Sequence, residues 1–345
     1  MSTSRRTGRV LRVVVSALLA VFVMGVTAPL GHAAAETGPP LSVPRAALDA
    51  SLDCDAFTHP EHEPVLLVHG TFTHGKEQWD WTWRNPLRER GFDTCVVTYP
   101  DRGLGDMQVS AEYVVDAVRR VSAATGSKVD VVGHSQGGIL PRWALRWWPD
   151  VRAAVDDYVG LASPNHGVGV LDGTLAAANL LRLPLPEVIR QFGSASAFTR
   201  ALNSGDETPG DVDYTDIYTT YDEAVRPVAP VPTAALDWNR GNPKAANVLL
   251  QDVCPGRLVE HAYLGLFDRA TFELTVDALA GTGPANIPRA GGPAICGPLP
   301  AFPTPVLDPT LLEDLLDLLP GELATLPVDL HLTTREPPLR DYATG

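Results

Sequence analysis

A serine between two glycines, placed between an apolar run and an amphipathic stretch, is the feature that most constrains the fold. Residues 128–133 form a Val-rich run typical of a buried strand, and apolar residues recur at helical spacing over 139–147. Between them, Gly133-His134-Ser135-Gln136-Gly137 matches G-x-S-x-G, which needs a strand before it and a helix after it. The pattern predicts a sharp turn that lifts the hydroxyl of Ser135 above the edge of a sheet.

The rest of the chain alternates between strand-like and helix-like stretches. Short apolar runs that are rich in Val and bounded by turn residues are typical of strands buried on both faces. One helix is expected between the second and third runs, with Ser110 as its N-cap and Gly126 at its end. This alternation predicts an α/β fold, with a mostly parallel central sheet and helices on both faces. The expected strands are 64–68, 94–99, 128–133, 157–162, 216–220 and a weaker 257–260.

An activated serine needs a base and an acid, and in folds built around this turn they follow in the order serine, acid, histidine. Three histidines follow Ser135. His166 comes only one strand later, and His331 lies in the Leu-rich tail. His261 directly follows the last strand-like run and is therefore the predicted base.

The acid should follow the preceding strand, and Asp222 stands there directly after the 216–220 run. Its role would be to fix the tautomer of the imidazole and to stabilise the imidazolium. Glu223 is the rival, and Asp213 and Asp216 are further acids in the same region. Spacing alone does not decide among them.

Acyl transfer also needs N–H donors for the developing oxyanion. One is expected from the amide of Gln136, which directly follows the nucleophile. The second should come from the loop after the 64–68 strand, where Thr71 is the candidate through its N–H, with its hydroxyl as an additional donor. A His-Gly pair after a strand is also compatible with a simple tight turn. The expected oxyanion hole is therefore Thr71 and Gln136.

These motifs resemble the lipase B family of α/β-hydrolases over about residues 47–298. The resemblance is carried by the stretches 64–71, Ser135-Gln136-Gly137-Gly138, 222–227 and His261-Ala262. It implies an α/β-hydrolase fold that hydrolyses carboxylic esters, acylglycerols included, without a metal or an organic cofactor. Matched residue by residue, the family's nucleophile falls on Ser135, its acid on Asp222, its base on His261 and its oxyanion donors on Thr71 and Gln136.

The cysteines fit the same resemblance. There are four, and an even number in an exported chain suggests disulfides, with three possible connectivities. Their spacings match no metal-ligand pattern. The family resemblance implies the pairs Cys54–Cys95 and Cys254–Cys296, and a third family bridge near the C-terminus has no cysteines here, so the tail must be held differently.

Two departures from the family concern the site. The chain has Val68-His69-Gly70 where the family has Val-Pro-Gly, and His134 where the typical member has a Trp that lines the alcohol pocket. A smaller, polar residue before the nucleophile should change the preference for the alcohol. The family's stereoselectivity therefore cannot be transferred to this chain.

The N-terminus has the three parts of a secretory signal peptide. Arginines between Arg5 and Arg12 precede an apolar run over 13–26 and three alanines at 33–35. That run is short for a membrane span, which needs roughly 20 residues. We expect a secreted protein with cleavage near Ala35; an uncleaved anchor is the alternative, and the Arg5-Arg6 pair leaves Sec or twin-arginine export open.

Changes in composition along the 345 residues indicate how the chain is divided into segments. After the signal peptide (1–35) we expect an α/β-hydrolase catalytic domain over 36–300 and a Pro/Leu-rich tail over 301–345. Within the domain, residues 167–203 are Ala/Leu-rich and lack a strand pattern, which predicts a helical cap or lid, either mobile or fixed. In the tail, leucines from Leu311 to Leu319 predict an amphipathic helix that meets either a lipid–water interface or a core or dimer contact.

The formal net charge of −14, without a basic stripe, argues against a nucleic-acid partner. We expect a monomer that acts on ester or lipid substrates, with a lipid–water interface as a further partner. The alternatives are a polyester hydrolase or acyltransferase with the same triad, and a non-catalytic exported binding protein.

Overall fold

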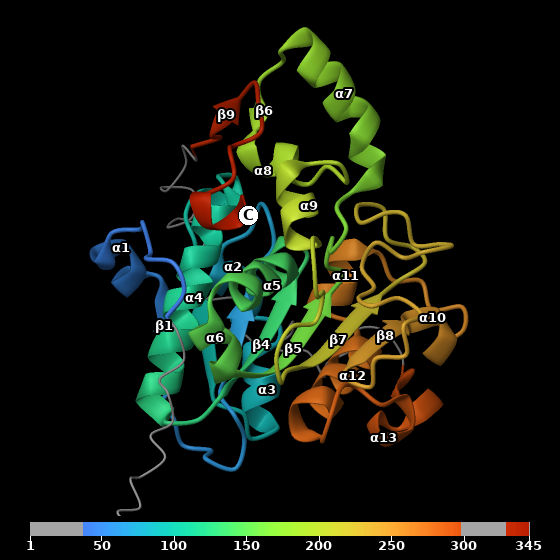
Figure 1. The fold of residues 1–345 in the computed structure, drawn as a ribbon. Coiled ribbons are helices and arrows are strands. Elements are labelled where there is room, and N and C mark those ends of the chain that lie inside the picture. Colours follow the sequence, from blue (N-terminus) through green and yellow to red (C-terminus); the bar gives the residue numbers. More distant parts are fainter. Residues whose placement is uncertain (1–36, 298–328, 345) are drawn as a thin grey trace, which may run out of the picture. The chain divides into compact units, whose positions relative to one another are not determined.

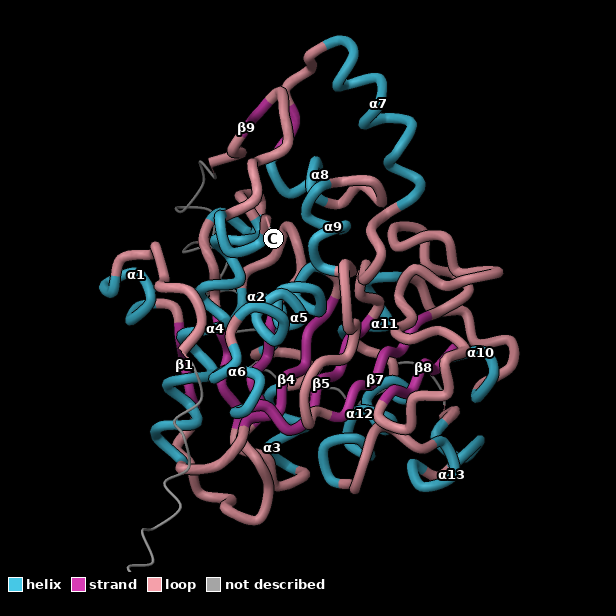
Figure 2. The backbone as a smooth tube through the Cα atoms, in the orientation of Figure 1, coloured by secondary structure: helices cyan, strands magenta, loops and turns pink. Residues whose placement is uncertain are grey.

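A seven-stranded sheet runs through the part of the chain that the structure, a computed structural model, describes, namely residues 37–297 and 329–344. The strand order is β1-β3-β2-β4-β5-β7-β8, and every neighbouring pair is parallel except β1 with β3. Figure 2 shows the strands of this sheet in magenta, with helices around them. The mostly parallel sheet expected from the sequence is confirmed. The strands are β1 (Leu52–Cys54), β2 (Val65–Val68), β3 (Thr94–Val97), β4 (Val129–His134), β5 (Val155–Leu161), β7 (Asp213–Tyr218) and β8 (Ala245–Leu249).

Successive residues of the central strands enter two different cores. In β2, Leu66 and Val68 belong to one buried cluster, and Val65 and Leu67 belong to the other. All four residues of β2 are buried, as are all four of β3 and all six of β4. Continuous apolar runs therefore form these strands because both faces of the sheet are covered.

Helices cover the two faces. Residues of α4, α5, α6, α8 and α9 join the first cluster, and residues of α3, α10, α11 and α12 join the second. The α-helices are α1 (Arg45–Ala50), α2 (Gly75–Trp79), α3 (Arg84–Glu89), α4 (Met107–Thr125), α5 (Gln136–Trp147), α6 (Pro149–Ala154), α7 (Asp172–Leu181), α8 (Glu187–Gln191), α9 (Ala197–Leu202), α10 (Leu250–Val253), α11 (His261–Leu266), α12 (Arg269–Ala280) and α13 (Ile287–Ala290). Short 3-10 turns are Asp101–Gly103, Gly169–Leu171, Gly292–Ile295 and Asp341–Ala343.

The end of the sheet differs from the sequence prediction. No strand forms at 257–260, and the last strand is instead β8, which lies at the sheet's edge. Only Val248 of its five residues is buried, so the apolar pattern was too weak to reveal it. Val259 is not in a strand, but its side chain is buried in the second hydrophobic cluster. Its carbonyl accepts a hydrogen bond from Oγ1 of Thr219 at 2.8 Å.

The helix α4 begins earlier than predicted. Its N-cap is Asp106 and not Ser110, and the carboxylate of Asp106 accepts a hydrogen bond from the amide of Gln108. Ser110 is buried one turn inside the helix. The predicted end is confirmed, because Gly126 adopts the left-handed conformation at the C-cap with φ of 73°.

The insertion at 167–203 is helical, as expected, and consists mainly of α7, α8 and α9. It also contains a strand that was not expected, β6 (Leu185–Pro186), which pairs in antiparallel fashion with β9 (Leu332–Thr333). Figure 1 shows α7 and this β6–β9 pair at the end of the described domain opposite α12 and α13.

The last described residues are held without a disulfide. The carboxylate of Glu336 accepts hydrogen bonds from the amides of Ala197 and Phe198 at the start of α9, both at 2.9 Å. The ring of Tyr342 packs against three tryptophans of the α5–α6 region: Trp143, Trp147 and Trp148. The tail is therefore anchored by hydrogen bonds and ring contacts, in place of the missing third bridge.

Two disulfides join Cys54 to Cys95 and Cys254 to Cys296, in the pairing that the resemblance implied. The predicted signal peptide and the predicted helix over 311–319 fall outside the described residues. Within the described ranges, every helix is too short or too polar to span a bilayer.

Candidate active site

Ser135 occupies the junction between β4 and α5, with φ of 56° and ψ of −123°. A non-glycine residue with positive φ is strained and persists only where its surroundings enforce it. The two flanking glycines permit the turn: a Cβ on Gly133 would lie 1.9 Å from the carbonyl oxygen of Gly137, and a Cβ on Gly137 would lie 2.2 Å from that of Val68. The strand–turn–helix that the motif requires is present.

His261 and Asp222 come together beyond the carboxyl ends of the strands. Nδ1 of His261, the first residue of α11, lies 2.9 Å from Oδ2 of Asp222, which follows β7. Asp222 is 1% exposed, and its Oδ1 accepts hydrogen bonds from the amides of Ala224 and Val225. The carboxylate is therefore fixed by the backbone on one oxygen and faces the imidazole with the other.

The rival residues lie elsewhere or make a different contact. Glu223 accepts a hydrogen bond from the backbone amide of His261 at 3.1 Å and does not contact the ring nitrogens. Asp216 is buried inside β7 beside Asn165, at 2.7 Å, and burial raises the pKa of its carboxyl to about 8. His331 lies 2.8 Å from Asp101.

His166 also has partners away from Asp222. Its Nδ1 lies 3.1 Å from the carbonyl oxygen of Thr233, and its Nε2 lies 3.5 Å from Glu207. Burial alone would raise the pKa of the Glu207 carboxyl. The contact with His166 and other hydrogen bonds outweigh burial and lower this pKa to about 2.

His134, the last residue of β4, contacts His261. Its Nε2 lies 3.1 Å from the carbonyl oxygen of His261, and the two rings are 4.9 Å apart between centroids. Burial, together with the charge of His261, lowers the pKa of His134 to about 3, so its ring is neutral and Nε2–H donates to that carbonyl. A Cβ on Gly265 would lie 2.1 Å from the His134 ring, which explains the glycine in α11. His134 is 6% exposed, so it packs against α11 more than it lines an open pocket.

The two residues expected to supply oxyanion donors, Thr71 and Gln136, lie beside the turn at Ser135. Oγ1 of Thr71 donates to Oε1 of Gln136 at 2.8 Å, and a Cβ on Gly70 would lie 3.4 Å from Cβ of Ser135. The amide of Gln136 is the first of α5 and has no partner within the helix. The hydroxyl of Thr71 is therefore engaged with Gln136.

The loop that carries Thr71 is held by a buried histidine. The ring of His69 stacks on Tyr99 at 3.8 Å, and its Nδ1–H donates to the carbonyl of Gly70 at 2.8 Å. Burial lowers the pKa of His69 to about 3, so this ring also stays neutral. The sequence marked His69 only as a departure from the family, and the contact with Tyr99 explains what the residue does.

One contributor was missed by sequence reasoning. Glu260 is the N-cap of α11, and its carboxylate accepts hydrogen bonds from the amides of Ala262 and Tyr263 at 2.7 and 2.8 Å. The cap starts the helix at His261 and so sets where the imidazole lies. A glutamate is an uncommon N-cap, and the sequence therefore gave little signal for it.

Comparison with known proteins identifies the family of the chain. The family model described as Lipase (class 2) matches residues 62–234. The chain is 34% identical to Lipase B of Pseudozyma antarctica over 267 residues, which is 76% of this chain and 75% of that protein. It is 27% identical to a triacylglycerol lipase of Pseudomonas fragi over 42% of this chain and 50% of the relative.

Among solved structures, lipase B of Aspergillus fumigatus superposes with a TM-score of 0.74 at 29% identity, covering 90% of this chain and 74% of that one. The resemblance to the lipase B family and the α/β-hydrolase fold are thereby confirmed. The chain belongs to the class 2 lipase family and is a carboxylic ester hydrolase.

Proposed function

We propose that the chain is a secreted lipase or carboxylesterase that cleaves esters through an acyl-enzyme on Ser135. The observation that carries this is the His261–Asp222 pair, 2.9 Å apart and joined through His134 to the strained turn at Ser135. Family membership supports ester hydrolysis, and the two disulfides are consistent with an oxidising compartment.

Each residue has one task in this reaction. Nε2 of His261 accepts the proton of the Ser135 hydroxyl as its oxygen attacks the ester carbonyl, and Asp222 stabilises the resulting imidazolium. The amides of Gln136 and Thr71 donate to the oxyanion. His261 then returns the proton to the leaving alcohol, and a water activated by the same nitrogen releases the acid from Ser135.

The proposed substrates are esters with apolar acyl chains, met at a lipid–water interface. Large apolar side chains are exposed directly beside the site: Phe72, which follows Thr71, is 63% exposed, and Tyr221, which precedes Asp222, is 45% exposed. Leu180 and Leu181 at the end of α7 are 83% and 65% exposed. Neighbouring exposed apolar residues are typical of surfaces that meet a partner or a lipid.

A chain-length series tests the substrate class. The purified protein is assayed on nitrophenyl esters of increasing length and on emulsified short- and long-chain triacylglycerols, with Ser135→Ala as the matched control. We expect turnover of both soluble esters and emulsions by the wild type, and none by the variant. If the protein degraded a polyester film far better than any soluble ester or emulsion, it would instead be a polyester hydrolase. Full activity of Ser135→Ala would reject the acyl-enzyme.

A further inference from the structure

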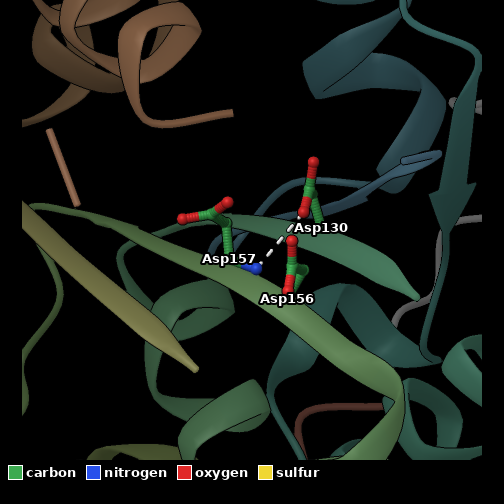
Figure 3. A group of neighbouring side chains, drawn as sticks. All are labelled: Asp130, Asp156 and Asp157. Atoms are coloured by element: carbon green, nitrogen blue, oxygen red, sulfur yellow. Dashed lines mark hydrogen bonds between the residues drawn. The ribbon is translucent and has the colours of Figure 1, made fainter. Parts of the chain in front are cut away.

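Three aspartates meet at the edge of the sheet opposite the candidate active site, near the amino ends of β4 and β5. Val129 pairs with Val155 and Val131 with Tyr158, so Asp130 alone opposes two residues, Asp156 and Asp157. Such a two-against-one bulge is rare between parallel strands and redirects side chains. Figure 3 shows the three carboxylates gathered over these two strands, and one oxygen of each lies within 4.8 Å of the others.

Two of these carboxylates are buried with unmet hydrogen-bonding capacity. Asp130 is 1% exposed and Asp157 is 5% exposed. Oδ1 of Asp130 accepts a hydrogen bond from the amide of Asp157 at 3.2 Å. Oδ2 of Asp130 and Oδ1 of Asp157 are buried and accept no hydrogen bond from any described residue. Buried polar atoms without a partner are uncommon in folded proteins and indicate an ion or a water that they contact.

The surrounding charge is unbalanced in the same direction. Burial first, and then the neighbouring acids, raises the pKa of the Asp130 carboxyl well above its usual value. The same causes raise the pKa of the Asp157 carboxyl to about 8. Glu63, before β2, adds negative potential at both carboxyls, and Asp213, at the start of β7, adds it at Asp157. The facing cation is Lys128, whose Nζ lies 2.7 Å from Oδ1 of Asp156. This pair is partly exposed, at 37% for Lys128 and 43% for Asp156, so the ammonium can move away into solvent.

We propose that Asp130, Asp156 and Asp157 bind a divalent cation of the oxygen-preferring kind, with Ca²⁺ as the expected ion. The donors are all carboxylate oxygens, which suit Ca²⁺, Mg²⁺ or Mn²⁺ and offer no nitrogen or sulfur for zinc or copper. A bulge supplies ligands at irregular angles, and Ca²⁺ tolerates irregular geometry whereas Mg²⁺ requires a near-ideal octahedron. Water would complete the shell on the exposed side of Asp156.

The site is a structural one. It lies at the amino ends of the strands, whereas Ser135 and Asp222 follow carboxyl ends. The cation would link β4 to β5 at the bulge, where the regular pairing is interrupted. Its binding is therefore expected to change stability and not the chemistry at Ser135, and the proposal stands apart from the proposed function.

Thermal unfolding is the first test. Protein freed of metal with EDTA is compared with the same protein in about 10 mM CaCl₂, which at a Kd on the order of 0.1–1 mM should raise Tm by roughly 2–5 °C. Asp157→Asn keeps the shape of the side chain but removes a ligand charge, and its Tm should not respond to Ca²⁺. Asp211→Asn is the matched control, since Asp211 is an exposed acid paired with Lys244, and its response should equal that of the wild type.

Direct binding is the second test. Lys128→Met removes the competing ammonium and should tighten Ca²⁺ binding several-fold by isothermal titration calorimetry. Two results would overturn the proposal. One is a wild-type protein whose Tm is the same in EDTA and in CaCl₂ and which shows no Ca²⁺ binding heat, which would mean that the acids share protons instead. The other is an equal response to Ca²⁺ in the wild type and in Asp157→Asn, which would place the ion elsewhere.

Discussion

Nδ1 of His261 and Oδ2 of Asp222 lie 2.9 Å apart, although one residue starts a helix and the other follows a strand. The second oxygen of Asp222 is held by two backbone amides, so the carboxylate has a single orientation. The ring proton is therefore placed on Nδ1, and Nε2 is the nitrogen that can accept a proton. This relationship distinguishes Asp222 from its neighbour Glu223.

Replacing Asp222 with Asn should lower kcat by about 10⁴-fold, because the amide stabilises the wrong tautomer of the base. The variant should fold normally, with unchanged circular dichroism. Glu223→Gln is the matched control, because Glu223 contacts only the backbone of His261, and it should keep most of the activity. If instead Glu223→Gln were the inactive variant, the acid would have been assigned to the wrong residue.

Thr71→Val tests which group of Thr71 meets the oxyanion. The variant keeps the backbone N–H and loses the hydroxyl that donates to Gln136. We expect kcat to fall roughly 10-fold through loosening of the loop, well short of the ~100-fold or more that follows loss of an oxyanion donor. A decrease beyond 100-fold, measured on a short soluble ester, would instead make the hydroxyl itself a donor.

His134→Gln should change how stability depends on pH. The pKa of His134 is lowered from 6.5 to about 3 in the folded protein, so the unfolded chain binds a proton that the native state does not. Above pH 6.5, His134 is neutral in both states and does not lower the stability of the folded protein. As the pH falls from 6.5 toward 3, only the unfolded chain takes up this proton, so the folded protein loses stability. Within that window, the free energy of unfolding of the wild type should therefore fall relative to that of His134→Gln by about 1.4 kcal/mol for each pH unit of acidification.

Urea unfolding of both proteins at several pH values measures this difference directly. His69, whose pKa is also lowered to about 3, is present in both proteins and cancels. Parallel stability curves for the wild type and the variant would show that His134 is not held neutral.

The disulfide between Cys54 and Cys95 joins the edge strand β1 to β3. Replacing both cysteines with alanine should lower the free energy of unfolding by roughly 2–4 kcal/mol. Activity at 25 °C should persist, because the bridge joins β1 to β3, whereas Ser135, Asp222 and His261 come from other elements. A double variant as stable as the wild type in denaturant titrations would contradict this.

The strand–turn–helix at Ser135 could be predicted because its local pattern is complete: an apolar run, two glycines around Ser135 and an amphipathic helix. The order of motifs then led to His261 and Asp222, which the structure brings together. The missed elements lack such a pattern. The edge strand β8 is mostly half-exposed, and Glu260 caps α11 with a residue type that rarely does so.

The pairing of β6 with β9 could not be predicted from the sequence either. Leu185 pairs with Thr333 in a strand of two residues, and Pro186 is one of them. Neither side shows alternation, and the two partners lie far apart in the chain, so only the folded structure reveals how the tail returns to the cap.

The proposed triad is tested most directly by the rate at which a fluorophosphonate modifies Ser135, followed by mass spectrometry of the peptide that carries it. We expect a single adduct on Ser135 in the wild type, and a rate of modification at least roughly 1000-fold slower in His261→Ala, because the serine then has no base. An adduct on another residue, or equal rates in the two proteins, would contradict the proposed triad.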